Sequence, residues 1–99
     1  MRTMLRASFP VVKSNQAIRD GSLPKIMQGV MELLKPESAY FFADGGRRAC
    51  QMVFDMKDPS QIPVIAERFF MGLDADVDFK PVMSAEDLAK GLDQVAKTS

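Results

Sequence analysis

Two apolar segments separated by Asp44-Gly45-Gly46 constrain the fold of this chain more than any other feature of its sequence. Ser38 to Ala43 is rich in Tyr and Phe, and Ala49 to Met56 is a second apolar run. Glycine readily adopts the positive φ angles that a tight hairpin turn requires. The pattern predicts an antiparallel β-hairpin, and the backbone geometry explains the glycine pair without a ligand.

Further strands are predicted near both ends of the chain. From Thr3 to Phe9, Leu5, Ala7 and Phe9 alternate with Met4, Arg6 and Ser8, which is typical of a strand with one buried face. Val77 to Met83 predicts the last strand. Pro81 lacks a donor for a neighbouring strand, so this strand is expected at an edge of the sheet.

Two helices are predicted between these strands. The first begins at Pro24 with Ser22 as its cap, and Pro36 prevents its continuation. The second follows Ser60 as the preferred cap and ends near Gly72. Both carry apolar residues at helical spacing, so each is expected to cover a sheet.

The remaining segments are a long connection and a terminal helix. Val11 to Leu23 is expected to be irregular apart from a short helical turn, capped by Ser14 or Asn15, that runs through Ile18 before Gly21 breaks it. Ser84 is expected to cap the final helix, with Asp87 reaching back as in a capping box. This element order predicts a single α+β domain over residues 1–99. The expected fold is ferredoxin-like βαββαβ with a C-terminal helix, a four-stranded antiparallel sheet and helices on one face.

The composition disfavours several classes of partner and site. Thirteen Lys and Arg balance thirteen Asp and Glu, so the basic surface of a nucleic-acid-binding protein is not expected. The single Cys50 forms no intrachain disulfide, and with no histidine and no paired cysteines we predict no metal and no cofactor. No leader peptide or apolar run long enough to cross a bilayer is recognised, so a soluble cytoplasmic protein without a membrane partner is expected.

The two faces of the predicted sheet differ in composition. One face collects Leu5, Ala7, Phe9, Cys50, Met52 and Phe54 beneath the helices. The other mixes polar and apolar side chains, namely Met4, Arg6, Ser8, Gln51, Val53 and Val82. Such a face suits a contact with the sheet of a second copy, and the competing interpretation is a solvated sheet.

Two sequence stretches carry a resemblance to a known family. Phe54-Asp55-Met56 running into Asp58-Pro59-Ser60, and Pro81-Val82-Met83 before Ser84, resemble short proteins of the dimeric α+β barrel superfamily. The resemblance spans nearly the whole chain. It implies a ferredoxin-like protomer that dimerises through its sheet, with the last helix at the periphery. Several members use a histidine, which this chain lacks, so no catalytic residue is transferred.

Arg6 is the most informative candidate for a ligand site. A guanidinium on a central strand requires a carboxylate or a ligand as its partner. In the expected strand order Asp78 faces Arg6 from the last strand, which predicts a structural ion pair, with an anchor for an anionic ligand as the alternative. Tyr40 is a candidate to lend its phenol to such a site, although aromatic packing also explains it.

Other motifs have ordinary explanations. Asp74, Asp76 and Asp78 alternate as in a calcium loop, but the glycine and glutamate that such a loop needs are missing. Gly45-Gly46-Arg47-Arg48 could present donors to an anion, and a solvated turn is the simpler interpretation. Cys50 shares a face with Arg48, which could activate the thiol, but a buried apolar cysteine is favoured.

Two functional hypotheses therefore remain. The first is a homodimeric module that binds a small apolar or weakly acidic molecule between its sheet and its helices. The alternative is a small cofactor-independent enzyme, of isomerase or monooxygenase type, in which Arg6 and Tyr40 polarise a reactive aromatic substrate. RNA binding through the same fold is disfavoured, because Gln51 and Val53 occupy positions where stacking aromatics are required.

Overall fold

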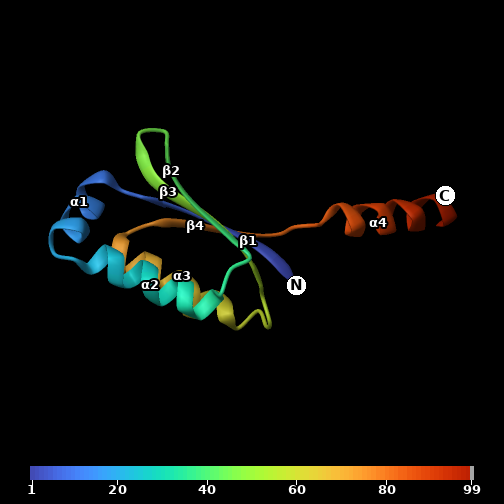
Figure 1. Ribbon diagram of the computed structural model, residues 1–99, viewed down its shortest axis with the longest axis horizontal. Helices are drawn as coiled ribbons and strands as arrows, with labels where there is room; N and C mark the ends of the chain where they lie inside the picture. Colours follow the sequence, from blue (N-terminus) through green and yellow to red (C-terminus); the bar gives the residue numbers. More distant parts are fainter. Residues whose placement is uncertain (99) are drawn as a thin grey trace.

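The computed structural model describes residues 1–98 and contains four strands and four helices within them. In chain order these are β1 (Arg2–Phe9), α1 (Val11–Arg19), α2 (Ser22–Leu34), β2 (Ser38–Asp44), β3 (Arg47–Asp55), α3 (Gln61–Leu73), β4 (Asp76–Pro81) and α4 (Ala85–Thr98). The strands form one antiparallel sheet in the order β2-β3-β1-β4, with β2 and β4 as its edges. Helices α1 to α3 lie on one face of the sheet (Figure 1). The predicted ferredoxin-like α+β fold is confirmed.

The core lies between the sheet and these helices. In the register of β1 and β3, Leu5 pairs with Met52 and Ala7 pairs with Cys50, and all four side chains are buried. The ring of Phe9 stacks on that of Phe69 from α3, with 6.1 Å between their centroids. The predicted helix-side face of the sheet is therefore correct, because strict alternation places its apolar residues beneath the helices.

The hairpin between β2 and β3 forms at the predicted glycine pair. Gly45 and Gly46 have φ angles of 60° and 78°. A side chain at either position would be strained in this left-handed conformation, which explains the two glycines. The turn places Asp44 opposite Arg47 at the tip.

The segment after β1 is more regular than predicted. Instead of an irregular connection, it forms α1, and Pro10 occupies the position just before the helix. The carbonyl of Pro10 accepts a hydrogen bond from the Ser14 amide at 2.9 Å. Proline needs no amide partner at a helix start, so Pro10 both ends the strand and begins the helix. Ser14 and Ala17 face the interior and are buried.

The starts of α2 and α3 correct the predicted caps. Ser22 lies inside α2, and the residue before the helix is Gly21, with a φ angle of 79°. The Asp20 carboxylate accepts a hydrogen bond from the Ser22 amide at 2.8 Å, so Asp20 takes the role predicted for the Ser22 side chain. The helix α3 does follow Ser60, as predicted, but the Ser60 side chain makes no cap hydrogen bond. Instead the Asp58 carboxylate accepts a hydrogen bond from the Ser60 amide at 2.8 Å.

The strand β4 lies at an edge of the sheet, as predicted, but it ends at Pro81 instead of Met83. The amide of Val82 still donates to the Arg2 carbonyl at 3.1 Å. The chain is therefore held to the sheet through Val82, and only Met83 and Ser84 separate this point from α4.

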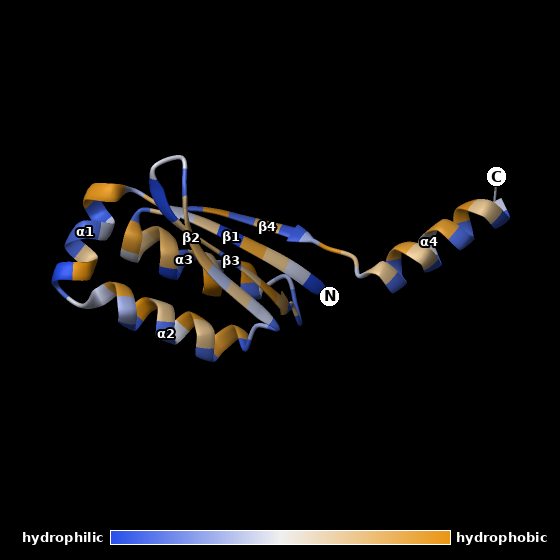
Figure 2. Cartoon of the chain, turned by 45° about the horizontal axis from the view of Figure 1, so that its top comes forward, coloured by the Kyte–Doolittle hydropathy of each residue, from blue (hydrophilic) through white to orange (hydrophobic). Residues whose placement is uncertain are grey.

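The helix α4 extends away from the rest of the domain (Figures 1 and 2). The predicted capping box is present, because Ser84 and Asp87 exchange hydrogen bonds at 3.0 and 3.1 Å. None of its described residues is buried. The extended helix gives the molecule principal dimensions of 56 × 28 × 18 Å. Across residues 1–98, no helix has the combination of length and apolar character that crossing a bilayer requires.

Candidate functional site

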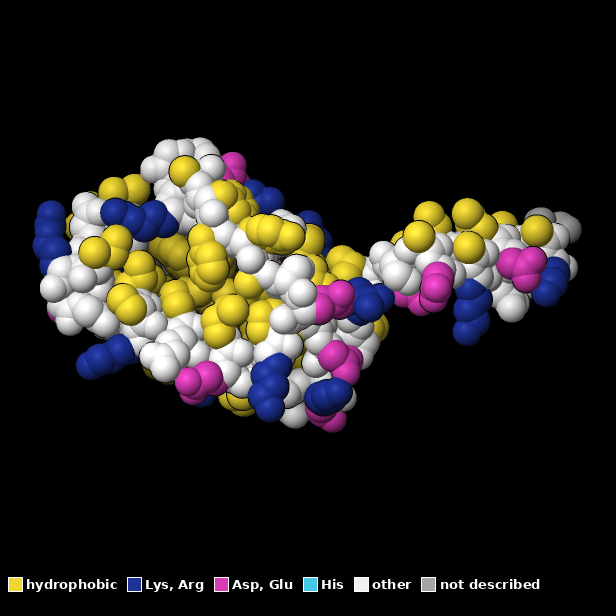
Figure 3. All heavy atoms as spheres, in the orientation of Figure 1, with side chains coloured by type: hydrophobic (Ala, Val, Ile, Leu, Met, Phe, Trp, Pro, Cys, Tyr) yellow, Lys and Arg dark blue, Asp and Glu magenta, His cyan; other side chains and the backbone are white. Residues whose placement is uncertain are grey.

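A groove of about 390 Å³ lies between α1, α2 and the β2–β3 hairpin. Its lining is apolar except for one guanidinium and consists of Phe9, Ile18, Leu23, Met27, Phe41, Phe42, Arg48 and Ala49. Figure 3 shows apolar side chains gathered in the hollow between α2 and the hairpin. We call this site the Arg48 groove.

The groove exists because the helices do not cover the edge strand β2. Alternation along β2 turns Phe41 toward the helix side of the sheet, where it pairs with Cys50 in register. Cys50 is fully buried, whereas the Phe41 side chain is 60% exposed. The apolar surface that a covering helix would bury is therefore open at this edge.

The position of Arg48 is fixed by α1. Its Nη1 atom donates to the Ser14 hydroxyl at 2.7 Å and to the Asn15 amide oxygen at 2.9 Å. Both partners are neutral, and within residues 1–98 no carboxylate forms an ion pair with Arg48. A guanidinium carries five N–H donors in a planar fork, so Arg48 retains donors for an anion.

Arg6 and Asp78 do not form the predicted ion pair. They are directly opposite in the register of β1 and β4, as expected from the strand order. The guanidinium of Arg6 instead reaches across β3 and forms an ion pair with Asp44 at the end of β2. The guanidinium also lies over the ring of Phe42, 5.4 Å from its centroid. This cation–π contact helps to hold the Arg6 side chain toward β2 and away from Asp78.

Tyr40 and Asp78 lie exposed on the sheet face opposite the helices. Tyr40 is 65% exposed and shares a row across the sheet with Gln51 and Arg6. Neither Arg6, Tyr40 nor Asp78 lines the Arg48 groove. The structure thus brings Arg6 and Tyr40 to one face of the sheet but encloses neither of them in that groove.

Three other depressions have less capacity for an acidic ligand. One of about 410 Å³ is lined by Arg2, Glu37, Asp55 and Asp87, whose charges already pair with one another or with neighbours. Another of about 290 Å³ lies at the end of α2, and the Asp55 carboxylate in its lining pairs with Lys57 and disfavours an anion beside Lys35. A third, of about 170 Å³, is apolar and lies beside Phe79 and Pro81.

Cys50 is an inert thiol in this environment. Its side chain is fully buried, and burial raises the pKa of the thiol to about 11. A nucleophilic cysteine needs a lowered pKa, so the interpretation of Cys50 as a small core residue is favoured. In the described part of the chain, no three His, Cys, Asp or Glu side chains are grouped to hold a metal ion.

Comparisons with known proteins bear on the fold. No family model matches the sequence, and no curated protein matches it. Among solved structures, the chain is similar to a formyltetrahydrofolate deformylase from Pseudomonas putida KT2440, with a TM-score of 0.55 and 16% sequence identity. The match covers 83% of this chain but only 29% of that chain. At this identity the likeness concerns the fold alone.

The signal for the Arg48 groove was only partly present in the sequence. Met27 was recognisable as an apolar helix residue, and Arg48 as a cation beside a turn. What the sequence did not indicate is that Ser14 and Asn15, more than thirty residues away, hold Arg48 at the groove. Those partners belong to α1, in a segment that the sequence predicts to be mostly irregular.

Proposed function

We propose that this protein binds a small amphipathic acid, a molecule with an apolar body and one anionic group, in the Arg48 groove. The observation that carries this proposal is the half-buried guanidinium of Arg48, which has neutral partners only and lies at the wall of an apolar groove. A partly desolvated cation without a counter-charge is stabilised when a carboxylate binds it.

The size and lining of the groove support the same class of ligand. Ligand sites enclose roughly 300 to 1,000 Å³ and are mostly apolar with a few placed polar groups. The groove, at about 390 Å³, is near the lower end of this range, and Phe9, Met27 and Phe41 supply apolar contacts. An aromatic acid or a medium-chain fatty acid fits this combination.

We propose in addition that the module is a homodimer in which the open faces of two sheets meet. Met4 and Val53, neighbours in the register of β1 and β3, are half-buried on this face, and Tyr40 is mostly exposed. A mixed face of this kind supports a sheet-to-sheet contact of moderate polarity. The resemblance to dimeric α+β barrel proteins supports the same arrangement.

The enzyme hypothesis has less support. It assigned Arg6 and Tyr40 to a common substrate pocket, whereas Arg6 is engaged by Asp44 and Phe42. A guanidinium in such contacts must give up an ion pair before it can polarise a substrate. We therefore favour binding without catalysis.

Ligand binding can be tested by calorimetry and thermal shift with decanoate, 2-naphthoate and the neutral control 1-decanol. We expect both acids to bind and to raise the melting temperature, since a ligand at a hundred times its Kd adds about 2.7 kcal/mol of stability. Decanol should bind at least tenfold more weakly than decanoate.

Two matched variants assign the site. Arg48→Gln should weaken decanoate binding at least tenfold, whereas Arg47→Gln should not, because Arg47 already pairs with Asp76. Phe41→Ala should also weaken binding, and its exposed position makes misfolding a poor explanation. Equal binding of decanoate by all of these variants, or no binding of either acid, would refute the proposal.

A further inference from the structure

The helix α4 carries a broad uncharged face that its own domain does not cover. Successive residues are about 100° apart around a helix, which gathers the uncharged side chains over about half of its circumference. They are Ala85, Leu88, Ala89, Gly91, Leu92, Val95 and Ala96. The charged residues Glu86, Asp87, Lys90, Asp93 and Lys97 occupy the other side, as Figure 3 shows. Leu88, Leu92 and Val95 are between 47% and 58% exposed.

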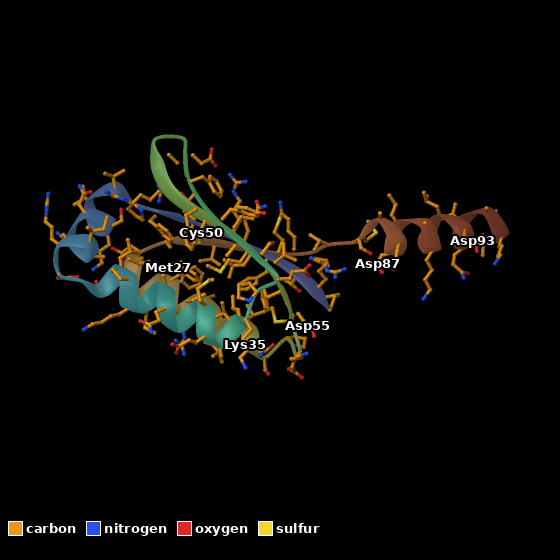
Figure 4. The ribbon with its side chains drawn as sticks, in the orientation of Figure 1. Met27, Lys35, Cys50, Asp55, Asp87 and Asp93 are labelled. Carbon is orange, nitrogen blue, oxygen red and sulfur yellow. The ribbon has the colours of Figure 1, made fainter. Side chains whose placement is uncertain are left out.

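The domain also carries an apolar channel that lacks a helix. It extends the Arg48 groove, which is lined by Leu23, Met27 and Phe41, along α2 and β2 to the partly buried Met31 and Ala39. We call these five residues the α2–β2 channel. Apart from the mostly exposed Phe41, they pack against the core yet are only partly buried. In Figure 4, Met27 points from α2 toward the sheet, where Cys50 lies.

The dimensions of the helix and the channel agree. At 1.5 Å per residue the 14 residues of α4 span about 21 Å, and the 13 residues of α2 span about 20 Å. The seven residues of β2 span about 23 Å. A contact with one other helix needs only a narrow apolar stripe, whereas the uncharged face of α4 covers about half of the helix. A face this broad suits contact with α2 and β2 at the same time.

The α4 of the same chain cannot reach this channel. Val82 is held to β1, so the connection to Ala85 is about 10 Å long even when fully extended. In the order β2-β3-β1-β4, three strand spacings separate β4 from β2, or about 14 Å. The connection would also have to rise from the sheet to the level of the helices. The only contact between charged groups of α4 and the described domain is the exposed pair of Arg2 and Asp87 at 3.9 Å.

We propose that α4 is an exchanged arm, which lies in the α2–β2 channel of a second copy while that copy returns its own α4. This inference shares with the proposed function only the requirement that two copies associate, and it does not depend on the sheet-to-sheet contact. A mutual exchange closes by two-fold symmetry and buries both arms and both channels at once. Leu23, Met27 and Phe41 line both the channel and the Arg48 groove, so the arm would contact any acid bound there.

Two other occupants fit the helix less well. A membrane surface is recognised by helices with a basic polar face, whereas α4 has three acidic residues and two lysines. A coiled coil with another α4 needs three to four heptads, and 14 residues supply two.

Sedimentation of variants tests the exchange. The wild-type chain should dimerise, and Leu88→Ser combined with Leu92→Ser should raise the dimer dissociation constant at least tenfold. Lys90→Ser combined with Lys97→Ser, on the charged face, should leave it unchanged. The domain should remain folded by circular dichroism, because these side chains make no buried contacts in their own chain. A monomeric wild type, or equal effects of the two double variants, would overturn the inference.

Cross-linking then identifies where the arm lies. Chains carrying Leu92→Cys are mixed with chains carrying Phe41→Cys and treated with a short bifunctional maleimide, while the buried native Cys50 stays unreactive. A mixed cross-linked pair supports the exchange. Pairs joined only through Leu92→Cys on both chains, or cosedimentation of the wild type with anionic lipid vesicles in place of dimers, would refute it.

Two further variants separate this inference from the proposed function. Arg48→Gln should weaken decanoate binding at least tenfold and leave the cross-link intact. Val53→Glu acts on the open sheet face, and if it leaves the dimer unchanged while the arm variants dissolve it, the sheet contact fails and the exchange stands. If Val53→Glu loses the dimer while the arm variants keep it, the exchange fails and the sheet contact stands.

Discussion

The Nη1 atom of Arg48 lies 2.7 Å from the hydroxyl oxygen of Ser14, and this contact joins β3 to α1. Ser14 is fully buried, so its hydroxyl has no access to water as a substitute partner. The pair therefore contributes to both the stability of α1 and the position of the guanidinium at the groove.

Replacing this hydroxyl should destabilise the protein. We expect Ser14→Ala to lower the free energy of unfolding by about 1.5 kcal/mol, since hydrogen bonds to charged groups contribute more than neutral ones. Urea denaturation measures the change. Ser60→Ala is the control, because the exposed Ser60 side chain makes no cap hydrogen bond and its loss should change stability by less than about 0.5 kcal/mol. Equal stability of Ser14→Ala and the wild type would contradict the role of this contact.

The thiol of Cys50 should resist modification in the folded protein. Burial excludes the reagent and raises the thiol pKa to about 11, so little thiolate exists at pH 8. Ellman's reagent should titrate less than a tenth of Cys50 in native protein within minutes, and all of it in 8 M urea. Val12→Cys, at a position on α1 that is 71% exposed, should add one rapidly reacting thiol as a positive control. Rapid native labelling of Cys50 would show that the strand opens easily.

Acid should remove a stabilising contribution from Asp55. Hydrogen bonds from Lys57 and the amino group of Met1 hold the pKa of this carboxyl at about 2, below its usual 3.8. Because the folded-state pKa is lowered, the contribution is complete above about pH 4 and is lost as the pH falls toward 2. Asp55→Asn should therefore destabilise the protein at pH 7 and lose its difference from wild type near pH 2. Asp78→Asn, at a position without an ion pair in the described residues, should show no such convergence.

The stacked rings of Phe9 and Phe69 should be a major source of stability. Phe69 is fully buried, so Phe69→Ala leaves a cavity and should cost about 3 to 5 kcal/mol. Val12, which is 71% exposed, gives the matched surface truncation Val12→Ala, with an expected change below about 0.5 kcal/mol. Thermal unfolding measures the loss of stability in both variants. Equal melting temperatures for Phe69→Ala and Val12→Ala would contradict the buried position of Phe69.

Local patterns were sufficient to predict the sheet. Alternation in β1, the Gly45-Gly46 turn and the edge position of Pro81 each depend on a few neighbouring residues. They determine backbone geometry directly, so the strands and the buried face could be read from them. The capping box of α4 was predictable for the same reason.

Long-range contacts were not predictable from such patterns. The helix α1 has few apolar residues at helical spacing, and its buried Ser14 is stabilised by Arg48 from another part of the chain. Arg6 likewise has its partner two strands away in Asp44, although Asp78 lies directly opposite. The candidate groove depends on how far α2 lies from β2, a packing distance that local sequence does not specify.

The composition of the edge strand β2 favours aggregation when the strand is uncovered. From Ala39 to Ala43 it presents five uncharged residues, three of them aromatic, and its one charged residue, Asp44, lies at the end of the strand. This stretch has none of the charges or prolines that usually protect an edge. A segment of this composition can template the growth of cross-β aggregates. In the proposed exchange the arm of a second copy covers Phe41, so chains without a partner should precipitate before they unfold.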